Sequence, residues 1–262
     1  MAAGRIVGIV PVLIALSVLT HTGTASPVAA PVWEDDLENA TRLVDLFPAD
    51  GSRFTQLQVE QGGACALDHE IVRGGANSVK CVAPGVGQPK ADLGRQDATS
   101  EIPSQPAPPR FGQLADQELW AEMWFYVLDA GSCEGLFLWD IEESVANSAG
   151  LRVYCKTDPG SGVDYLKMNS EFGNSFQPDP PFIQLPFAQW VRVRVYVKFH
   201  VLVGAVKIWI DDTLVLDATG RTARARRSIY DSIQWGITVN ASGRAQTVYV
   251  DDVSIRNRDP GW

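Results

Sequence analysis

The stretch Trp190-Val191-Arg192-Val193-Arg194-Val195-Tyr196-Val197-Lys198-Phe199-His200 decides the fold, because apolar and polar residues alternate along its whole length. The four valines and Phe199 face one way, and the other six residues face the opposite way. A period of two is typical of a β-strand with one buried and one exposed face. The pattern returns at residues 206–210, and Asp211-Asp212 supplies a turn into residues 214–216. The segment 190–216 is therefore predicted to form antiparallel strands joined by tight turns.

Alternation of the same kind predicts further strands at residues 120–128, 136–140, 151–156, 165–172, 232–239 and 247–255. No stretch after residue 30 shows the period of an amphipathic helix. Many short strands joined by Gly, Pro, Asn and Asp turns indicate an all-β protein, an antiparallel two-sheet β-sandwich. Residues 84–112 carry six prolines, so we expect a long surface crossover there with at most one short edge strand.

The order of these segments carries a family resemblance. The strand 190–195, the hairpin 206–212 and the closing strand Val248-Tyr249-Val250-Asp251-Asp252-Val253-Ser254-Ile255 follow one another as in the concanavalin A-like lectin/glucanase superfamily. The chain resembles that superfamily over roughly residues 60 to 256, with Thr213 in place of the usual hairpin glycine. The resemblance implies a jelly-roll β-sandwich, laminin-G-like or polysaccharide-lyase-like. It does not choose among lectins, glucanases and lyases.

Residues 1–30 are predicted to be a signal peptide and a short tail, with Arg5 before an apolar run from Ile6 to Leu19 and cleavage after Ala25 or Ala30. That run is too short to span a bilayer. We expect a secreted monomer in which residues 31–262 form a single jelly-roll domain, with no membrane attachment after cleavage. The formal charge of −9 argues against nucleic-acid partners.

Four cysteines follow the signal, and an even number favours disulfides in an exported protein. Cys65 and Cys81 are placed symmetrically about a Gly-rich turn near residue 73, and Cys133 and Cys155 about a small polar stretch near residue 144. The two cysteines of each pair would lie opposite each other in a hairpin. The predicted disulfides are therefore 65 with 81 and 133 with 155.

A polysaccharide or cell-surface glycan is the expected partner, because aromatic rings stack on sugar faces and arginine binds carboxylate or sulfate. The candidate ligand-binding residues come from the polar faces of three strands: Trp190, Arg192, Tyr196 and Lys198; Glu122 and Trp124; Lys167 and Asn169. The alternative for the cationic members of the first strand is pairing with acids on the next strand, such as Asp211 or Asp251.

Catalysis is left open by the sequence. The family resemblance extends to two short elements of jelly-roll polysaccharide lyases, which are similar to Lys90-Ala91-Asp92-Leu93 and Tyr165-x-Lys167. A lyase cleaving a uronate-containing glycan by β-elimination would use Tyr165 or His200 as base, and Arg194, Arg192 or Lys90 to neutralise the uronate. A retaining hydrolase is disfavoured, because Leu138 stands where the first glutamate of the laminarinase motif belongs.

No cofactor is certain, and the metal-binding residues are not identified. Asp211-Asp212 and Asp251-Asp252 are candidates for a structural calcium ion, which prefers carboxylate and carbonyl oxygens. Turn formation by the aspartates is the alternative.

Overall fold

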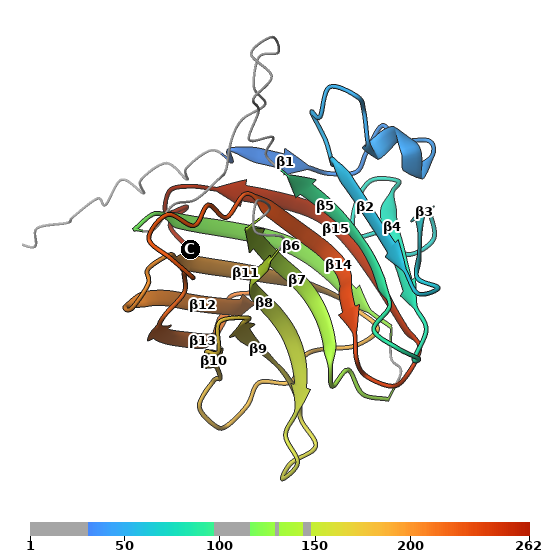
Figure 1. Cartoon of the computed structure of the whole chain (residues 1–262). Helices are drawn as coiled ribbons and strands as arrows, with labels where there is room; N and C mark the ends of the chain where they lie inside the picture. Colours follow the sequence, from blue (N-terminus) through green and yellow to red (C-terminus); the bar gives the residue numbers. More distant parts are fainter. Residues whose placement is uncertain (1–30, 97–115, 129–130, 144–147) are drawn as a thin grey trace, which may run out of the picture.

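The computed structural model describes residues 31–96, 116–128, 131–143 and 148–262. The expected signal peptide and most of the proline-rich crossover lie outside these ranges. Two antiparallel sheets pack face to face (Figure 1). None of the helices in the described ranges has the length and apolar character that crossing a membrane requires. The 3-10 helix Leu43–Leu46 precedes the second strand.

The first sheet, called sheet A, has eight strands. In spatial order they are β13 (Thr213–Gly220), β12 (Gly204–Ile210), β11 (Trp190–Lys198), β6 (Glu118–Val127), β15 (Gln246–Arg256), β4 (Ser78–Ala83) and β3 (Ala64–Asp68), with β1 (Trp33–Asp35) also paired to β15. The second sheet, called sheet B, has seven strands. Their order is β10 (Ser175–Phe176), β9 (Asp164–Ser170), β8 (Ser148–Thr157), β7 (Leu136–Glu143), β14 (Ser232–Asn240), β5 (Lys90–Gln96) and β2 (Gln56–Glu60).

The alternation along β11 sets its orientation. Its valines are buried between the two sheets. Each fully buried aliphatic side chain contributes roughly 1.5–3 kcal/mol, so turning this strand over would cost most of that gain. Large buried rings, including Trp139 and Trp235 from sheet B and Phe125 from sheet A, fill the space between the sheets. The predicted all-β two-sheet sandwich is confirmed.

The strand predicted within residues 84–112 is placed differently from expectation. We expected at most a short edge strand, but β5 is a seven-residue strand paired with β14 on one side and β2 on the other. The prolines of the segment fall outside β5, so they do not interrupt its ladder. Ala91 and Leu93 are buried in the core, which explains why the strand lies inside the sheet.

One predicted disulfide is confirmed and the other is not formed. Cys133 and Cys155 are bonded, with their Cα atoms 5.6 Å apart. Cys65 and Cys81 lie opposite each other on β3 and β4 as expected, but their sulfur atoms are 3.4 Å apart and both are free thiols. Directly opposed strand positions hold their Cβ atoms about 4.5–5.5 Å apart, which is wider than the roughly 3.8 Å of a disulfide.

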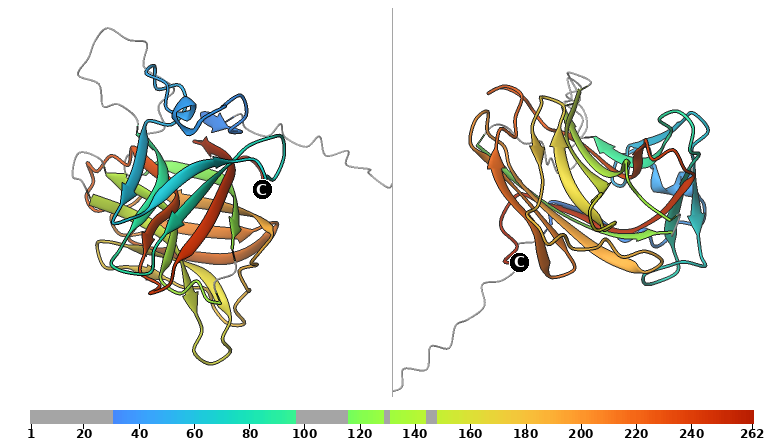
Figure 2. Two further views of the ribbon diagram at one scale, coloured as in Figure 1. Left: turned by 90° about the vertical axis from the view of Figure 1, so that its right-hand side faces the viewer. Right: turned by 90° about the horizontal axis from the view of Figure 1, so that it is seen from below.

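The sandwich leaves two faces free of the core, one on each sheet. Both sheets are curved, and the orange strands of sheet A lie at one margin while the cyan and teal segments lie at the other (Figure 2). Side chains that alternate with the core residues of β5, β14, β7, β8 and β9 form the free face of sheet B. Those of β6, β11, β12 and β15 form the outer face of sheet A.

The disulfide gives a prediction about stability. Replacing Cys133 and Cys155 by serine, or reducing the wild type, should lower the melting temperature by about 10 °C, since a loop closed across 22 residues is worth about 3 kcal/mol. Thermal unfolding with and without reductant measures this. Reductant should not affect the double variant, and an equal effect on both proteins would contradict the prediction.

Candidate functional site

The predicted site residues separate onto the two free faces. On the outer face of sheet A, Arg192 pairs with Trp124 and Arg194 with Glu122 across β11 and β6. The members found on this face are Trp190, Arg192, Arg194, Tyr196, Lys198, Glu122 and Trp124. Lys90, Tyr165, Lys167 and Asn169 lie on the free face of sheet B. Arg194 and Tyr165 therefore belong to opposite faces and do not meet in one groove, as β-elimination through both would need.

The arginines of β11 are already paired. Arg192 and Arg194 both bind the Asp212 carboxylate, at 2.6 and 3.0 Å, and Arg194 also donates to the Asp211 carbonyl at 2.5 Å. This is the pairing with a neighbouring strand considered as the alternative. Arg194 is only 6% exposed, and burial lowers the pKa of its guanidinium. These contacts give both side chains a role in holding the β12–β13 turn.

The aromatic residues of the same face pack against one another. The Tyr196 ring lies 4.3 Å from that of Trp120, and its hydroxyl donates to Glu118 at 3.1 Å. Burial raises the pKa of the Tyr196 phenol, so it is protonated at neutral pH. Trp190 packs edge-on against Tyr126 at 5.8 Å.

His200 lies just beyond β11 and closes a turn. Its Nδ1 accepts the backbone N–H groups of Leu202 and Val203 at 2.9 and 2.8 Å. Its Nε2 lies 3.6 Å from an Asp116 carboxylate oxygen. The imidazole nitrogens are thus directed at the local turn and at Asp116.

Tyr165 on sheet B is covered by a neighbouring loop. Its ring stacks on Phe182 at 4.1 Å with an interplanar angle of 9°, and it is 3% exposed. Burial raises the pKa of its phenol, which disfavours the phenolate that proton abstraction would require. The geometry therefore makes Tyr165 a packing residue.

A second tyrosine on sheet B, Tyr154, is better placed to contact a ligand. Tyr154 stacks on Phe137 with ring centroids 4.8 Å apart and an interplanar angle of 13°. We call Phe137 and Tyr154 the aromatic platform. Lys167 Nζ lies 5.5 Å from the Tyr154 ring, and the Arg152 guanidinium 5.9 Å from the Phe137 ring. Both platform residues are half-buried. The alternation of Arg152, Tyr154 and Lys156 with core residues was a signal in the sequence that pointed to this face.

Three carboxyl groups gather near the middle of sheet B, and we call Asp92, Asp140 and Glu142 the carboxyl centre. They lie on β5 and β7, on either side of β14. The Asp140 carboxylate accepts from Thr238 Oγ1 at 2.9 Å and lies 3.1 Å from Arg152 Nε. Glu142 accepts from Gln234 Nε2 at 2.9 Å.

Burial shifts the acidity of this centre. Asp140 is 1% exposed, and burial raises the pKa of its carboxyl to about 7 against the opposing effect of Arg152. Asp92 is fully buried, and neither of its oxygens has a hydrogen-bond partner among the described residues. Burial, with Asp140 nearby, raises the pKa of Asp92 well above its usual value. Burial therefore favours the neutral form of Asp92, while Asp140 can exchange a proton near pH 7.

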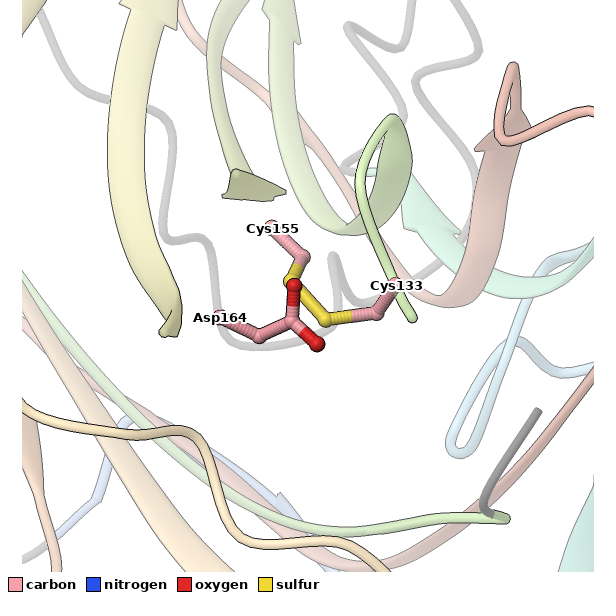
Figure 3. Close-up of side chains that lie close together, drawn as sticks. All are labelled: Cys133, Cys155 and Asp164. Carbon is pink, nitrogen blue, oxygen red and sulfur yellow. A yellow bond between two sulfur atoms is a disulfide. The ribbon is translucent and has the colours of Figure 1, made fainter. Parts of the chain in front are cut away.

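Among the described residues, one group of three potential metal ligands lies close together: Cys133, Cys155 and Asp164 (Figure 3). The two sulfurs bond to each other, so they offer no thiolate to a metal. Asp212 binds two arginines, and the Asp251 carboxylate accepts backbone N–H groups from Arg73 and Asp252. These contacts do not gather a calcium ligand set.

Comparison with solved structures supports the fold. The fold is the concanavalin A-like jelly roll. No protein-family model and no curated protein sequence matches the chain. Among solved structures, the chain is similar to the cellulose induced protein Cip1, with 17% identity over 86% of this chain and 97% of that one and a TM-score of 0.58. It is also similar to an endo-β-1,4-glucuronan lyase from the fungus Trichoderma reesei, with 12% identity over 79% and 94% and a TM-score of 0.50.

The carboxyl centre predicts a pH-dependent stability. Because the native pKa of Asp92 exceeds its unfolded value, folding takes up a proton at higher pH, and stability falls as pH rises above about 4. Asp92→Asn cannot titrate. Its melting temperature relative to wild type should therefore rise by several degrees between about pH 4 and about pH 8.

Thermal unfolding across that range measures the difference, with the exposed Glu70→Gln as the matched control. A constant offset between Asp92→Asn and wild type at all pH values would show that Asp92 does not titrate in this way.

Proposed function

We propose that this is a secreted protein that binds a polysaccharide along the free face of sheet B, with a sugar ring stacked on the aromatic platform. The observation that carries the proposal is the stacked Phe137–Tyr154 pair with a cation beside each ring. Aromatic faces bind the C–H faces of sugar rings, and adjacent cations bind their polar substituents. The fold shared with Cip1 and the glucuronan lyase is consistent with a glycan ligand.

The charges of this face favour an anionic glycan. Lys167 and Lys90 are held by amide oxygens, Gln177 and Gln58, each at 3.2 Å. Neither lysine has an ion pair with a carboxylate in the described part of the chain. Their charge is thus available to a uronate or sulfate group. Because burial raises the pKa of Asp92 and favours its neutral form, the carboxyl centre repels such a glycan less than three ionised acids would.

A polysaccharide lyase is the second candidate, favoured by the proximity of Tyr154 and Lys167. β-Elimination needs a cation that neutralises the uronate carboxylate and a base that removes the C5 proton. Lys167 and Tyr154 supply both groups within one pair of opposed strand positions. The Tyr154 oxygen, as phenolate, would accept the C5 proton, the C4–O bond would break, and the double bond would form between C4 and C5. A proton returned to the departing oxygen completes the reaction.

Export is supported by two features. The sequence opens with a positive residue and an apolar run typical of a signal peptide, and Cys133 and Cys155 form a disulfide. Disulfides persist in oxidising compartments, where extracellular glycans also occur.

Binding is tested by titrating oligoglucuronate, oligoalginate and oligogalacturonate into the protein. Tyr154→Ala should weaken binding about tenfold or more, since loss of ring stacking costs on the order of 1.5 kcal/mol. The matched control is Tyr126→Ala, a half-buried tyrosine on the outer face of sheet A, which should bind normally. If wild type binds none of these glycans, or Tyr154→Ala binds as tightly as wild type, the proposal fails.

The lyase candidate gives a separate prediction for Tyr154→Phe. This variant keeps the stacking ring and removes the hydroxyl, so it should bind glycan with near-normal affinity and lose formation of the unsaturated uronate product by at least about a hundredfold. Ultraviolet absorbance of the C4–C5 double bond measures the product. Absence of product from the wild type on every uronate polymer would leave glycan binding alone.

A further inference from the structure

We propose that the protein has a second saccharide site, for a neutral sugar, in a cavity on the outer face of sheet A. The cavity has a volume of about 720 Å³, within the usual range for small-molecule sites. It lies on the opposite face of the sandwich from the aromatic platform. The inference does not depend on the function proposed for sheet B.

The walls of the cavity come from segments far apart in the sequence. Glu122 and Trp124 of β6, with Ser254 and Arg256 of β15, line it from the sheet, and residues 34–39 line it from the N-terminal segment. That segment is fixed by two side chains. Asp35 binds Arg53 through both oxygens, at 2.7 and 2.5 Å. Glu38 accepts the backbone N–H groups of residues 76 and 77 at 3.0 Å. The cavity is thus held open by protein contacts before any ligand arrives.

Trp124 supplies an aromatic ring at this site. The Arg73 guanidinium lies 4.2 Å from the Trp124 ring and that of Arg192 lies 5.8 Å away. Asp252 and Asp212 in turn bind these two arginines. The indole is therefore fixed in orientation, and binding at it orders few additional side chains.

The charges of the lining select the ligand. Six carboxylates line the cavity against four guanidinium groups. Two of the guanidiniums, those of Arg53 and Arg73, are neutralised by Asp35 and Asp252 within the lining itself. The remaining excess is negative, so a uronate or sulfated glycan is repelled here. This separates the cavity from the lysine-bearing face of sheet B.

The polar groups that line the cavity are suited to binding sugar hydroxyls. The Glu122 carboxylate makes no hydrogen bond or ion pair with any residue in the described ranges, and it lies two residues from Trp124 on the same face of β6. A carboxylate accepts two hydroxyl donors, and the arginine–aspartate pairs offer further donors and acceptors in fixed positions. Polar side chains of both signs around one aromatic ring match an uncharged sugar, which carries many hydroxyls and an apolar ring face.

The test is calorimetric titration with neutral hexasaccharides of the cello-, xylo-, manno- and laminari- series, with oligoglucuronate for comparison. Wild type should bind at least one neutral series. Trp124→Ala should weaken that binding about tenfold or more, and Glu122→Gln, which keeps the shape of the side chain, about threefold or more. Tyr154→Ala, which alters the opposite sheet, should retain neutral-sugar binding while losing affinity for oligoglucuronate.

The inference is overturned if no neutral hexasaccharide binds the wild type, or if Glu122→Gln and a folded Trp124→Ala both bind normally. Loss of neutral-sugar binding in Tyr154→Ala, with retention in Glu122→Gln, would instead place that ligand on sheet B. Thermal unfolding of each variant shows whether it is folded. If Trp124→Ala does not fold, Glu122→Gln alone decides.

Discussion

The architecture depends on β14 being buried along its entire length. On one side, Ile233, Trp235 and Ile237 pack into the core between the sheets. On the other side, Gln234 and Thr238 are also buried and bind the acids of β7. Burying a polar side chain is costly unless it forms hydrogen bonds, so these two bonds link β14 to Asp140 and Glu142. The central strand of sheet B thus joins the stability of the fold to the chemistry of its free face.

The sequence predicted the strands well, because the alternation of apolar and polar residues is a local property that directly reflects the two faces of a strand. The predicted strands at 120–128, 206–210 and 232–239 correspond closely to β6, β12 and β14. β1 and β10 were not predicted, because strands of two or three residues are too short to show a period. β5 was predicted as at most a short edge strand, because the prolines of the segment argued against a central strand. The alternation of Ala91 and Leu93 is too short to argue for one. Which strands become neighbours depends on contacts between distant segments, and alternation carries no information about those.

The candidate site was harder to predict for the same reason. Polar faces of strands from sheets A and B look alike in sequence, so the lyase hypothesis combined Arg194 with Tyr165 although they belong to opposite faces. The acids of the carboxyl centre look like ordinary surface residues in the sequence, since the burial that shifts their pKa values arises only in the folded structure. Tyr154 and Tyr165 are equivalent in pattern, and only the position of Phe182 above Tyr165 distinguishes them. Spatial neighbours therefore decided which residues form each face.

The two free faces are built from different strands, so their chemistry can differ while they share one core. On the outer face of sheet A the arginines bind Asp212 and Asp252, whereas on sheet B Lys90 and Lys167 have no ion pair with a carboxylate in the described chain. The sheets approach closely at Gly236, whose φ is 121°. A Cβ there would lie 3.0 Å from Cys81 Sγ of sheet A and 3.2 Å from the Asp92 Cα. This position therefore couples the packing between sheets to the placement of the buried carboxyl, and only glycine meets both demands.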